Sequence, residues 1–114
     1  MTRPRLFAVL IVAATVTAAD AVSFAASAAP SVSIRLFRFR PAEIDVAAGT
    51  KVTWTNKDDI LHTVTSGTPD APAGGFTRRL DGKGAAASVQ FSRPGVYPYF
   101  CERHPAMRGE IRVN

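Results

Sequence analysis

The sequence predicts an all-β protein, a Greek-key β-sandwich of seven to eight strands. Short runs of alternating apolar and polar residues follow one another at close spacing over the C-terminal three quarters of the chain. Turns rich in Gly, Pro and Asp separate these runs. No segment beyond the N-terminal leader has a sustained period of 3.6 residues, so helices are not expected.

The first half of the predicted sandwich ends in its clearest strand. Apolar residues alternate from 32 to 36 and then change parity at Phe37, which indicates two strands or one strand with a bulge. A short strand at 44–46 is followed by a Gly-containing turn and by a strand over 51–56. Every second side chain of that strand faces the core, which places Asn56 at the end of the buried face.

The second half is expected to hold the remaining strands. The β-branched residues within 60–66 favour a strand, and a loop is expected over 66–75. Alternation predicts further strands over 87–91 and near the C-terminus. The strand over 96–101 contains Pro98, which cannot donate to a β-ladder and therefore favours an edge or irregular position.

Residues 1–28 are predicted to be a signal peptide. Its start is basic, its apolar run over 6–19 is shorter than the roughly 20 residues of a membrane span, and residues 26–28 form a small-residue cleavage pattern. An uncleaved membrane anchor is the alternative, but Asp20 interrupts the run. We therefore expect a single domain at 29–114, exported to the periplasm, with no membrane insertion after cleavage.

Charge and cysteine content narrow the possible roles of this domain. The net charge is +5 for the whole chain and about +4 without the leader. Because the basic residues are scattered along predicted strands, nucleic-acid binding is not expected, whereas a bias toward acidic protein partners is. The single cysteine cannot form an internal disulfide, which leaves a partner chain, a free thiol or a metal.

Residues 101–107 gather three side chains that bind soft metals. Cys101, His104 and Met107 are the only cysteine, one of two histidines and the only methionine besides Met1, and each lies three residues from the next. Taken singly, each is more often structural, but their scarcity and spacing favour a metal site. With His62, they supply one thiolate, two imidazoles and a weak axial thioether, the donor set of a blue-copper electron-transfer site. We therefore expect one copper ion per chain.

The motifs resemble the cupredoxin (blue copper protein) family, in particular its amicyanin and plastocyanin type. The resemblance rests on the Gly-Val-Tyr-Pro-Tyr-Phe-Cys run at 95–101, the Cys-x-x-His-x-x-Met loop, and the Val-Thr-Trp-Thr-Asn run at 52–56. It covers roughly residues 31–114 and implies a cupredoxin-like fold. The resemblance implies the equatorial ligands His62, Cys101 and His104, the axial ligand Met107, and the supporting residue Asn56, which would hydrogen-bond across to the ligand loop.

The same resemblance implies a soluble, monomeric electron carrier. Its redox partners would be a dehydrogenase as donor and a c-type cytochrome as acceptor. Two residues depart from the family pattern, since Leu61 and Arg103 stand where a proline is usual. The alternative is a copper delivery or storage module without a redox partner. We do not expect an enzyme, because the sequence offers no oxyanion-hole motif to accompany Cys101 and His104 as nucleophile and base.

Overall fold

The computed structural model describes residues 2, 4, 8–15 and 29–114. Residues 8–15 form neither helix nor strand, and their side chains are exposed. The remaining residues of the predicted signal peptide, including the cleavage pattern at 26–28, lie outside the described residues, so this prediction stays untested. Within the described part, no helix has the length and apolar character needed to cross a bilayer.

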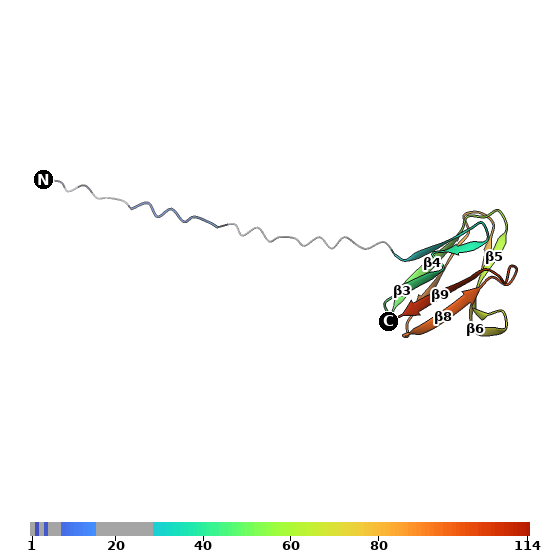
Figure 1. The fold of residues 1–114 in the computed structure, drawn as a ribbon. Coiled ribbons are helices and arrows are strands. Elements are labelled where there is room, and N and C mark those ends of the chain that lie inside the picture. The colour runs from blue at the N-terminus through green and yellow to red at the C-terminus, as the bar shows by residue number, and fades with distance from the viewer. Residues whose placement is uncertain (1, 3, 5–7, 16–28) are drawn as a thin grey trace.

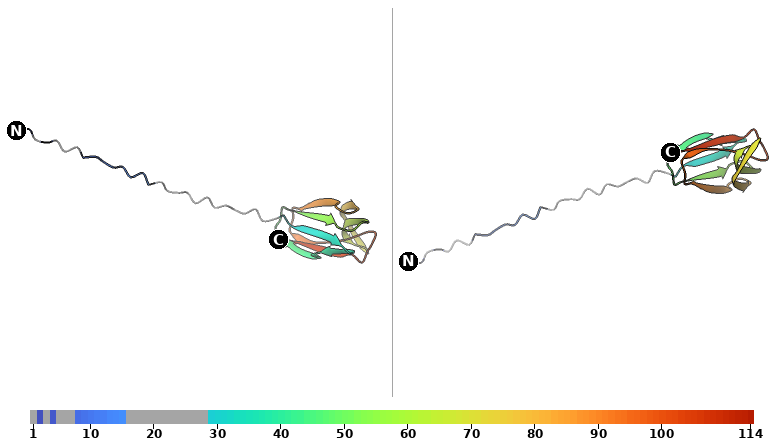
Figure 2. Two further views of the ribbon diagram at one scale, coloured as in Figure 1. Left: turned by 90° about the horizontal axis from the view of Figure 1, so that it is seen from above. Right: turned by 90° about the horizontal axis from the view of Figure 1, so that it is seen from below.

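The described part of the chain folds into nine strands in two mixed sheets, which pack as the two layers seen in Figures 1 and 2. The strands are β1 Ser31–Arg35, β2 Arg38–Arg40, β3 Glu43–Val46, β4 Thr50–Asn56, β5 Leu61–Thr68, β6 Ala71–Asp81, β7 Ala86–Phe91, β8 Gly95–Phe100 and β9 Arg108–Val113. One sheet has the order β2-β1-β4-β7 and the other β3-β9-β8-β5-β6. The predicted all-β sandwich is confirmed, with more strands than the expected seven to eight.

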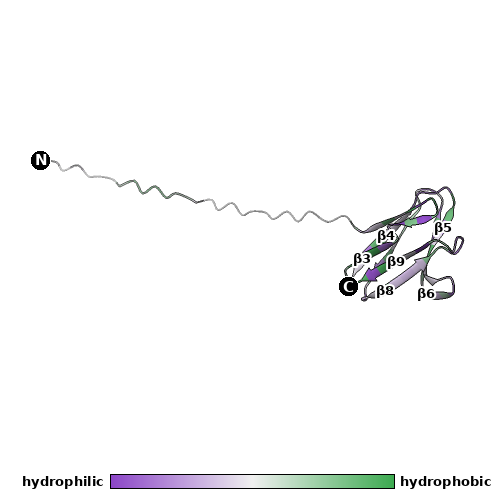
Figure 3. Cartoon of the chain, viewed as in Figure 1, coloured by the Kyte–Doolittle hydropathy of each residue, from purple (hydrophilic) through white to green (hydrophobic). Residues whose placement is uncertain are grey.

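Alternating side chains build one core between the sheets. Along β4 every second residue is buried, as predicted, and Asn56 ends that buried face. In Figure 3, which colours the chain by hydropathy, strands of both sheets contain apolar as well as polar residues. Trp54 and Tyr99 contact each other edge to face across the core, with ring centroids 5.3 Å apart. The core thus joins β4 of one sheet to β8 of the other.

The change of parity at Phe37 marks a hairpin turn between β1 and β2. Arg35 pairs with Arg38, which leaves Leu36 and Phe37 as the two loop residues. Their φ angles are 51° and 59°, in the left-handed region used by the primed two-residue turns of hairpins. Leucine and phenylalanine rarely adopt this conformation, so the turn needs support from other residues.

The prediction of a loop over 66–75 is wrong. This segment contains the end of β5 and the start of β6, which pair as an antiparallel hairpin. The register shifts between Thr65 and Gly67, because Thr65 is paired with Thr77 and Gly67 with Pro72, which leaves residues 73–76 of β6 opposite Ser66 alone. Gly67 has a φ of 101°. A side chain at Gly67 would meet backbone atoms of residues 71–73, so glycine allows β6 to approach closely without ending β5. A glycine at this position therefore does not mark a loop.

Pro98 was expected at a sheet edge or at an irregular position, and it lies in an interior strand at an irregular position. β8 lies between β9 and β5, and Pro98 is paired with Glu110 of β9. Toward β5, however, β8 is paired only through Tyr99 and Phe100. The expected irregularity is therefore present, because the stretch of β8 around the proline has no ladder partner on its β5 side.

Tyr99 should make the domain sensitive to alkaline pH. Burial raises the pKa of Tyr99 from 10.0 to about 12, and the neighbouring Trp54 only partly opposes this. Neither the Tyr99 hydroxyl nor the Trp54 indole nitrogen has a hydrogen-bond partner of good geometry in the described part of the chain. In the unfolded chain the phenol ionises near its ordinary pKa, whereas in the folded chain it stays neutral. The contribution of Tyr99 to stability is therefore complete below pH 10 and is lost as the pH rises through about 12.

The expected loss of unfolding free energy attributable to Tyr99 is about 2–3 kcal/mol. Denaturant titrations of the metal-free protein between pH 9 and 12 would measure it, and Tyr99→Phe should remove this part of the slope. Tyr97→Phe is the matched control, because the Tyr97 hydroxyl donates to the Arg93 carbonyl at the surface. Equal slopes for wild type and Tyr99→Phe would contradict the prediction.

Candidate metal centre

Neighbouring strands bring His62 and Cys101 together. His62 is the second residue of β5, and Cys101 directly follows β8, which pairs with β5 through Thr65 and Phe100. Both side chains are completely buried, and His62 Nδ1 lies 3.8 Å from Cys101 Sγ. The sulfur is a free thiol among the buried residues of the core. One predicted nitrogen donor and one predicted sulfur donor therefore face each other.

The spacing of these two atoms suits a shared metal. Zinc, a first-row metal, lies about 2.3 Å from thiolate sulfur and about 2.0 Å from imidazole nitrogen. Two such ligands at a trigonal angle of about 120° would be roughly 3.8 Å apart. The separation of Sγ and Nδ1 has this value, 3.8 Å, so one metal ion fits between them.

The ligand loop closes on itself and brings its two ends together. The Cys101 N–H donates to the Met107 carbonyl (3.1 Å), and the Met107 N–H donates to the His104 carbonyl (2.8 Å). Met107 is buried, whereas His104 is partly exposed. The His104 ring packs edge-on against the His62 ring, with centroids 5.4 Å apart. Within the described residues, no three His, Cys, Asp or Glu side chains are close enough to hold one metal ion together. His104 therefore lies beside the His62–Cys101 pair but does not form a three-residue metal site with it.

Thr63 connects β5 to the ligand loop twice. Its backbone N–H points at Cys101 Sγ at 3.4 Å, and its hydroxyl oxygen accepts the backbone N–H of Glu102 at 2.9 Å. The same hydroxyl contacts the Thr65 hydroxyl at 3.0 Å. Hydrogen bonds around the cysteine sulfur tune a blue-copper site, and bonds that orient a ligand loop fix its geometry. Thr63 therefore takes the bridging position that the sequence analysis assigned to Asn56.

The prediction that Asn56 hydrogen-bonds across to the ligand loop is wrong in this structure. Its side-chain nitrogen donates to the carbonyls of Ile60 (2.7 Å) and Leu80 (3.1 Å), and its side-chain oxygen accepts the N–H of Asp58 (2.9 Å). All three partners lie in or beside the β4–β5 connection or at the end of β6. These nearby backbone groups bind both the nitrogen and the oxygen of the Asn56 amide. Asn56 therefore supports the turn that leads to His62.

Loss of the Thr63 hydroxyl should loosen the ligand loop. In Thr63→Val the shape is nearly kept but the Glu102 N–H loses its acceptor, so we expect about 1–3 kcal/mol of destabilisation and roughly tenfold weaker copper retention. Competition with a chelator would measure retention. Thr53→Val is the matched control, because Thr53 bonds Ser88 (2.7 Å) in the other sheet. Equal copper retention in the two variants would contradict the role given to Thr63.

Asp58 is a site residue that the sequence analysis missed. Its carboxylate lies 2.9 Å from His62 Nε2, on the ring nitrogen opposite the one that faces Cys101. Burial alone would raise the pKa of Asp58, but hydrogen bonds from the Phe37 and Leu36 backbone and from His62 outweigh it, so the pKa is lowered. The only sequence signal was an acidic residue four positions before a predicted histidine ligand, which is too common to be specific.

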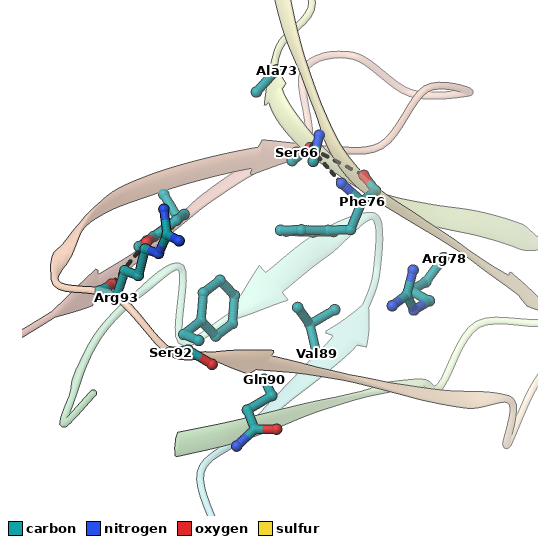
Figure 4. Close-up of a pocket in the computed structure, with 11 residues that line it drawn as sticks. Ser66, Ala73, Phe76, Arg78, Val89, Gln90, Ser92 and Arg93 are labelled. Atoms are coloured by element: carbon teal, nitrogen blue, oxygen red, sulfur yellow. Dashed lines mark hydrogen bonds between the residues drawn. The ribbon is translucent and has the colours of Figure 1, made fainter. Parts of the chain in front are cut away.

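A surface cavity of about 520 Å³ lies apart from these residues. It opens between the edge strands β6 and β7, with Phe76 and Val89 near its centre and Arg78 and Arg93 beside it (Figure 4). None of the predicted ligands lines it. The candidate metal centre is therefore a buried pair with its adjoining loop, and is not this cavity.

Comparison with known sequences identifies similar proteins along the whole domain. Residues 26–114 match the family described as copper binding proteins, plastocyanin/azurin family. Amicyanin-alpha of Methylorubrum extorquens is 32% identical over 97% of this chain and 98% of its own length. Plastocyanin A/B of Petroselinum crispum is 32% identical over 67% of this chain and 87% of its own length.

Solved structures have the same sandwich. A purple cupredoxin from Nitrosopumilus maritimus superposes with a TM-score of 0.68 at 26% identity, covering 75% of this chain and 99% of its own. The amicyanin of Paracoccus versutus superposes with a TM-score of 0.65 at 28% identity, covering 77% of this chain and 83% of its own. The similarity in sequence is therefore accompanied by a similarity in fold over three quarters or more of the chain.

Proposed function

Because the chain belongs to the plastocyanin/azurin family of copper-binding proteins, we propose that it shuttles single electrons between redox partners through one mononuclear site. Its cofactor is one copper ion per chain. The observation that carries the proposal is the buried His62–Cys101 pair, with Nδ1 and Sγ 3.8 Å apart. We propose that His104 and Met107, from the adjoining loop, complete the ligand set.

The donor set suits exchange of one electron. Bound copper supplies a Cu(II)/Cu(I) couple, for which thiolate and thioether sulfur favour Cu(I) and imidazole also accommodates Cu(II). His62 and Cys101 are held by the β5–β8 ladder, and the loop is held by its own two backbone hydrogen bonds. Because these contacts do not depend on the oxidation state, the ligands need to move little when an electron arrives or leaves.

His104 is the proposed route for electrons to the surface. It is the partly exposed histidine, and the exposed turn residues Leu36 and Phe37 lie on the same side of the site, since the Phe37 ring contacts His104. An apolar surface beside a partly exposed ligand allows a partner to approach closely without desolvating charge. Arg103 and Arg108 are exposed in and beside the loop and would steer acidic partners.

The physiological setting belongs to the same proposal. We propose export to the periplasm through the signal peptide, with a dehydrogenase as electron donor and a c-type cytochrome as acceptor. The similarity to relatives named as amicyanins supports the carrier role. We propose no catalytic activity for the chain itself.

The decisive experiment is the spectrum of the copper-loaded protein. An electron carrier of this kind should have an intense visible band from Cys101 thiolate to Cu(II), a matching paramagnetic-resonance signal, and fast reversible exchange at an electrode. Copper binding without the band would exclude the blue-copper site. A band with slow, irreversible exchange would instead favour delivery or storage of copper.

A further inference from the structure

The Asp58 carboxylate connects the candidate metal centre to a distant hairpin turn. Oδ2 lies 2.9 Å from His62 Nε2 and also accepts the Phe37 N–H at 3.1 Å. Oδ1 accepts the Leu36 N–H at 2.8 Å. The Asp58 side chain is only 12% exposed, and its own N–H is fixed by the Asn56 side chain. One carboxylate therefore holds three hydrogen-bond donors from two separate parts of the chain.

The contact between Asp58 and His62 decides which ring nitrogen of His62 carries the hydrogen and which carries the lone pair. An ionised carboxylate can only accept hydrogen bonds, so the ring hydrogen is on Nε2, between His62 and Asp58. Nδ1, which faces Cys101 Sγ, then carries the lone pair. Since the ring is completely buried, no solvent molecule competes for Nε2, and the carboxylate is the partner on that side of the ring that sets the tautomer and the ring orientation.

The contacts with the turn decide where Phe37 lies. Leu36 and Phe37 both have left-handed backbone angles, which such residues adopt only where the surroundings impose them. Here the two consecutive N–H groups are both fixed by Asp58. The Phe37 ring then packs edge-on against two imidazoles, with centroids 5.5 Å from His62 and 4.8 Å from His104.

We propose that Asp58 is a positioning residue that couples the exposed Leu36–Phe37 turn to both histidines of the copper site. Through Nε2 it orients His62 directly, and through the turn it seats Phe37 against His104. A partner that covers or displaces Phe37, which is 50% exposed, would thereby act on the ligands without touching the metal. This inference rests on the proposed function for its meaning, but its geometry can be tested without copper.

The metal-free protein provides the first test, by nitrogen-15 NMR of the His62 ring. Wild type should have the hydrogen on Nε2, and Asp58→Asn should lose this preference, because an amide offers one acceptor oxygen and turns a donor toward the remaining N–H groups. Asp59→Asn is the matched control, since Asp59 is the next residue, is exposed and takes no part in these bonds. A wild-type ring with its hydrogen on Nδ1, or equal tautomers in the two variants, would overturn the proposal.

The copper-loaded protein provides the second test. Asp58→Asn should retain copper roughly tenfold less well than Asp59→Asn in chelator competition. It should also have a higher reduction potential than that control, because loss of an anion bonded to the ligand disfavours Cu(II). An equal potential and equal retention in the two variants would overturn the role of Asp58.

Phe37→Leu tests the coupling through the turn separately from the direct contact between Asp58 and His62. It remains informative if Asp58→Asn does not fold. It should keep the Nε2 hydrogen of His62 in the metal-free protein but weaken copper retention. Unchanged copper retention would overturn the coupling through the turn. An absent blue band in wild type would instead count against the proposed function and leave the metal-free result standing.

Discussion

Cys101→Ser is expected to abolish the intense visible band of the copper-loaded protein completely. The band requires a thiolate bound to Cu(II), and Cys101 is the only cysteine of the chain. Copper retention should fall by more than about 100-fold, beyond the upper end of what loss of a supporting residue costs. Absorption spectroscopy and chelator competition would measure both effects.

The fold of Cys101→Ser should survive, because serine is close to cysteine in size and the buried position offers the Thr63 N–H as a partner. Thermal unfolding of the metal-free variant would check this. Met107→Leu is the matched control, since it removes the other sulfur of the loop by a swap of similar volume. It should keep the band and change the reduction potential, because the axial ligand tunes the potential without producing the colour. A band that survives in Cys101→Ser would exclude Cys101 as a ligand.

Gly109→Ala is expected to destabilise the domain by about 3 kcal/mol. Gly109 pairs with Tyr99 across β8 and β9, and a methyl group at Gly109 would overlap ring atoms of Tyr99, Cζ and the hydroxyl oxygen among them. Tyr99 is only 1% exposed and is packed against Phe39 and Trp54, so its ring has no free space into which to move. Denaturant unfolding of the metal-free protein would measure the loss.

A double-mutant cycle would identify the cause of that loss. In Tyr99→Leu the ring is absent, so adding Gly109→Ala should cost much less than it does in wild type. Gly75→Ala is a comparison at a glycine that also lacks a left-handed φ, where the added methyl would meet only the Ser66 side chain. Additive effects in the cycle would contradict the steric explanation.

Most of the fold could be predicted from local patterns. Alternation of apolar residues located most of the strands, and the clearest case, β4, has the predicted buried face with Asn56 at its end. The error in the fold, the loop expected over 66–75, concerned a glycine with an unusual role, since Gly67 lies within β5 where the register with β6 shifts. The irregular position expected for Pro98 is present, but in an interior strand, because β5 leaves that stretch unpaired. Such roles depend on the neighbouring strand, which local sequence does not specify.

The donor atoms of the candidate site could also be identified from the sequence, because scarcity and spacing single out Cys101, His104 and Met107 without reference to their neighbours. The match to the copper-binding family confirms the recognition and the cofactor. Their roles as ligands remain predictions, which Cys101→Ser and Met107→Leu test. What the structure adds is the position of His62, since the β5–β8 pairing places its Nδ1 beside the Cys101 sulfur.

The sequence by itself therefore determined the class of fold, the family and the copper cofactor. Only the tertiary structure decided which polar residues lie around His62 and Cys101. Asn56 was assigned the bridge to the ligand loop, but Thr63 makes it, and Asp58 joins His62 to backbone groups more than twenty positions away. The physical reason is that a polar side chain bonds whichever donor or acceptor the folded backbone places within about 3 Å, and strand pairing over long sequence distances sets that placement.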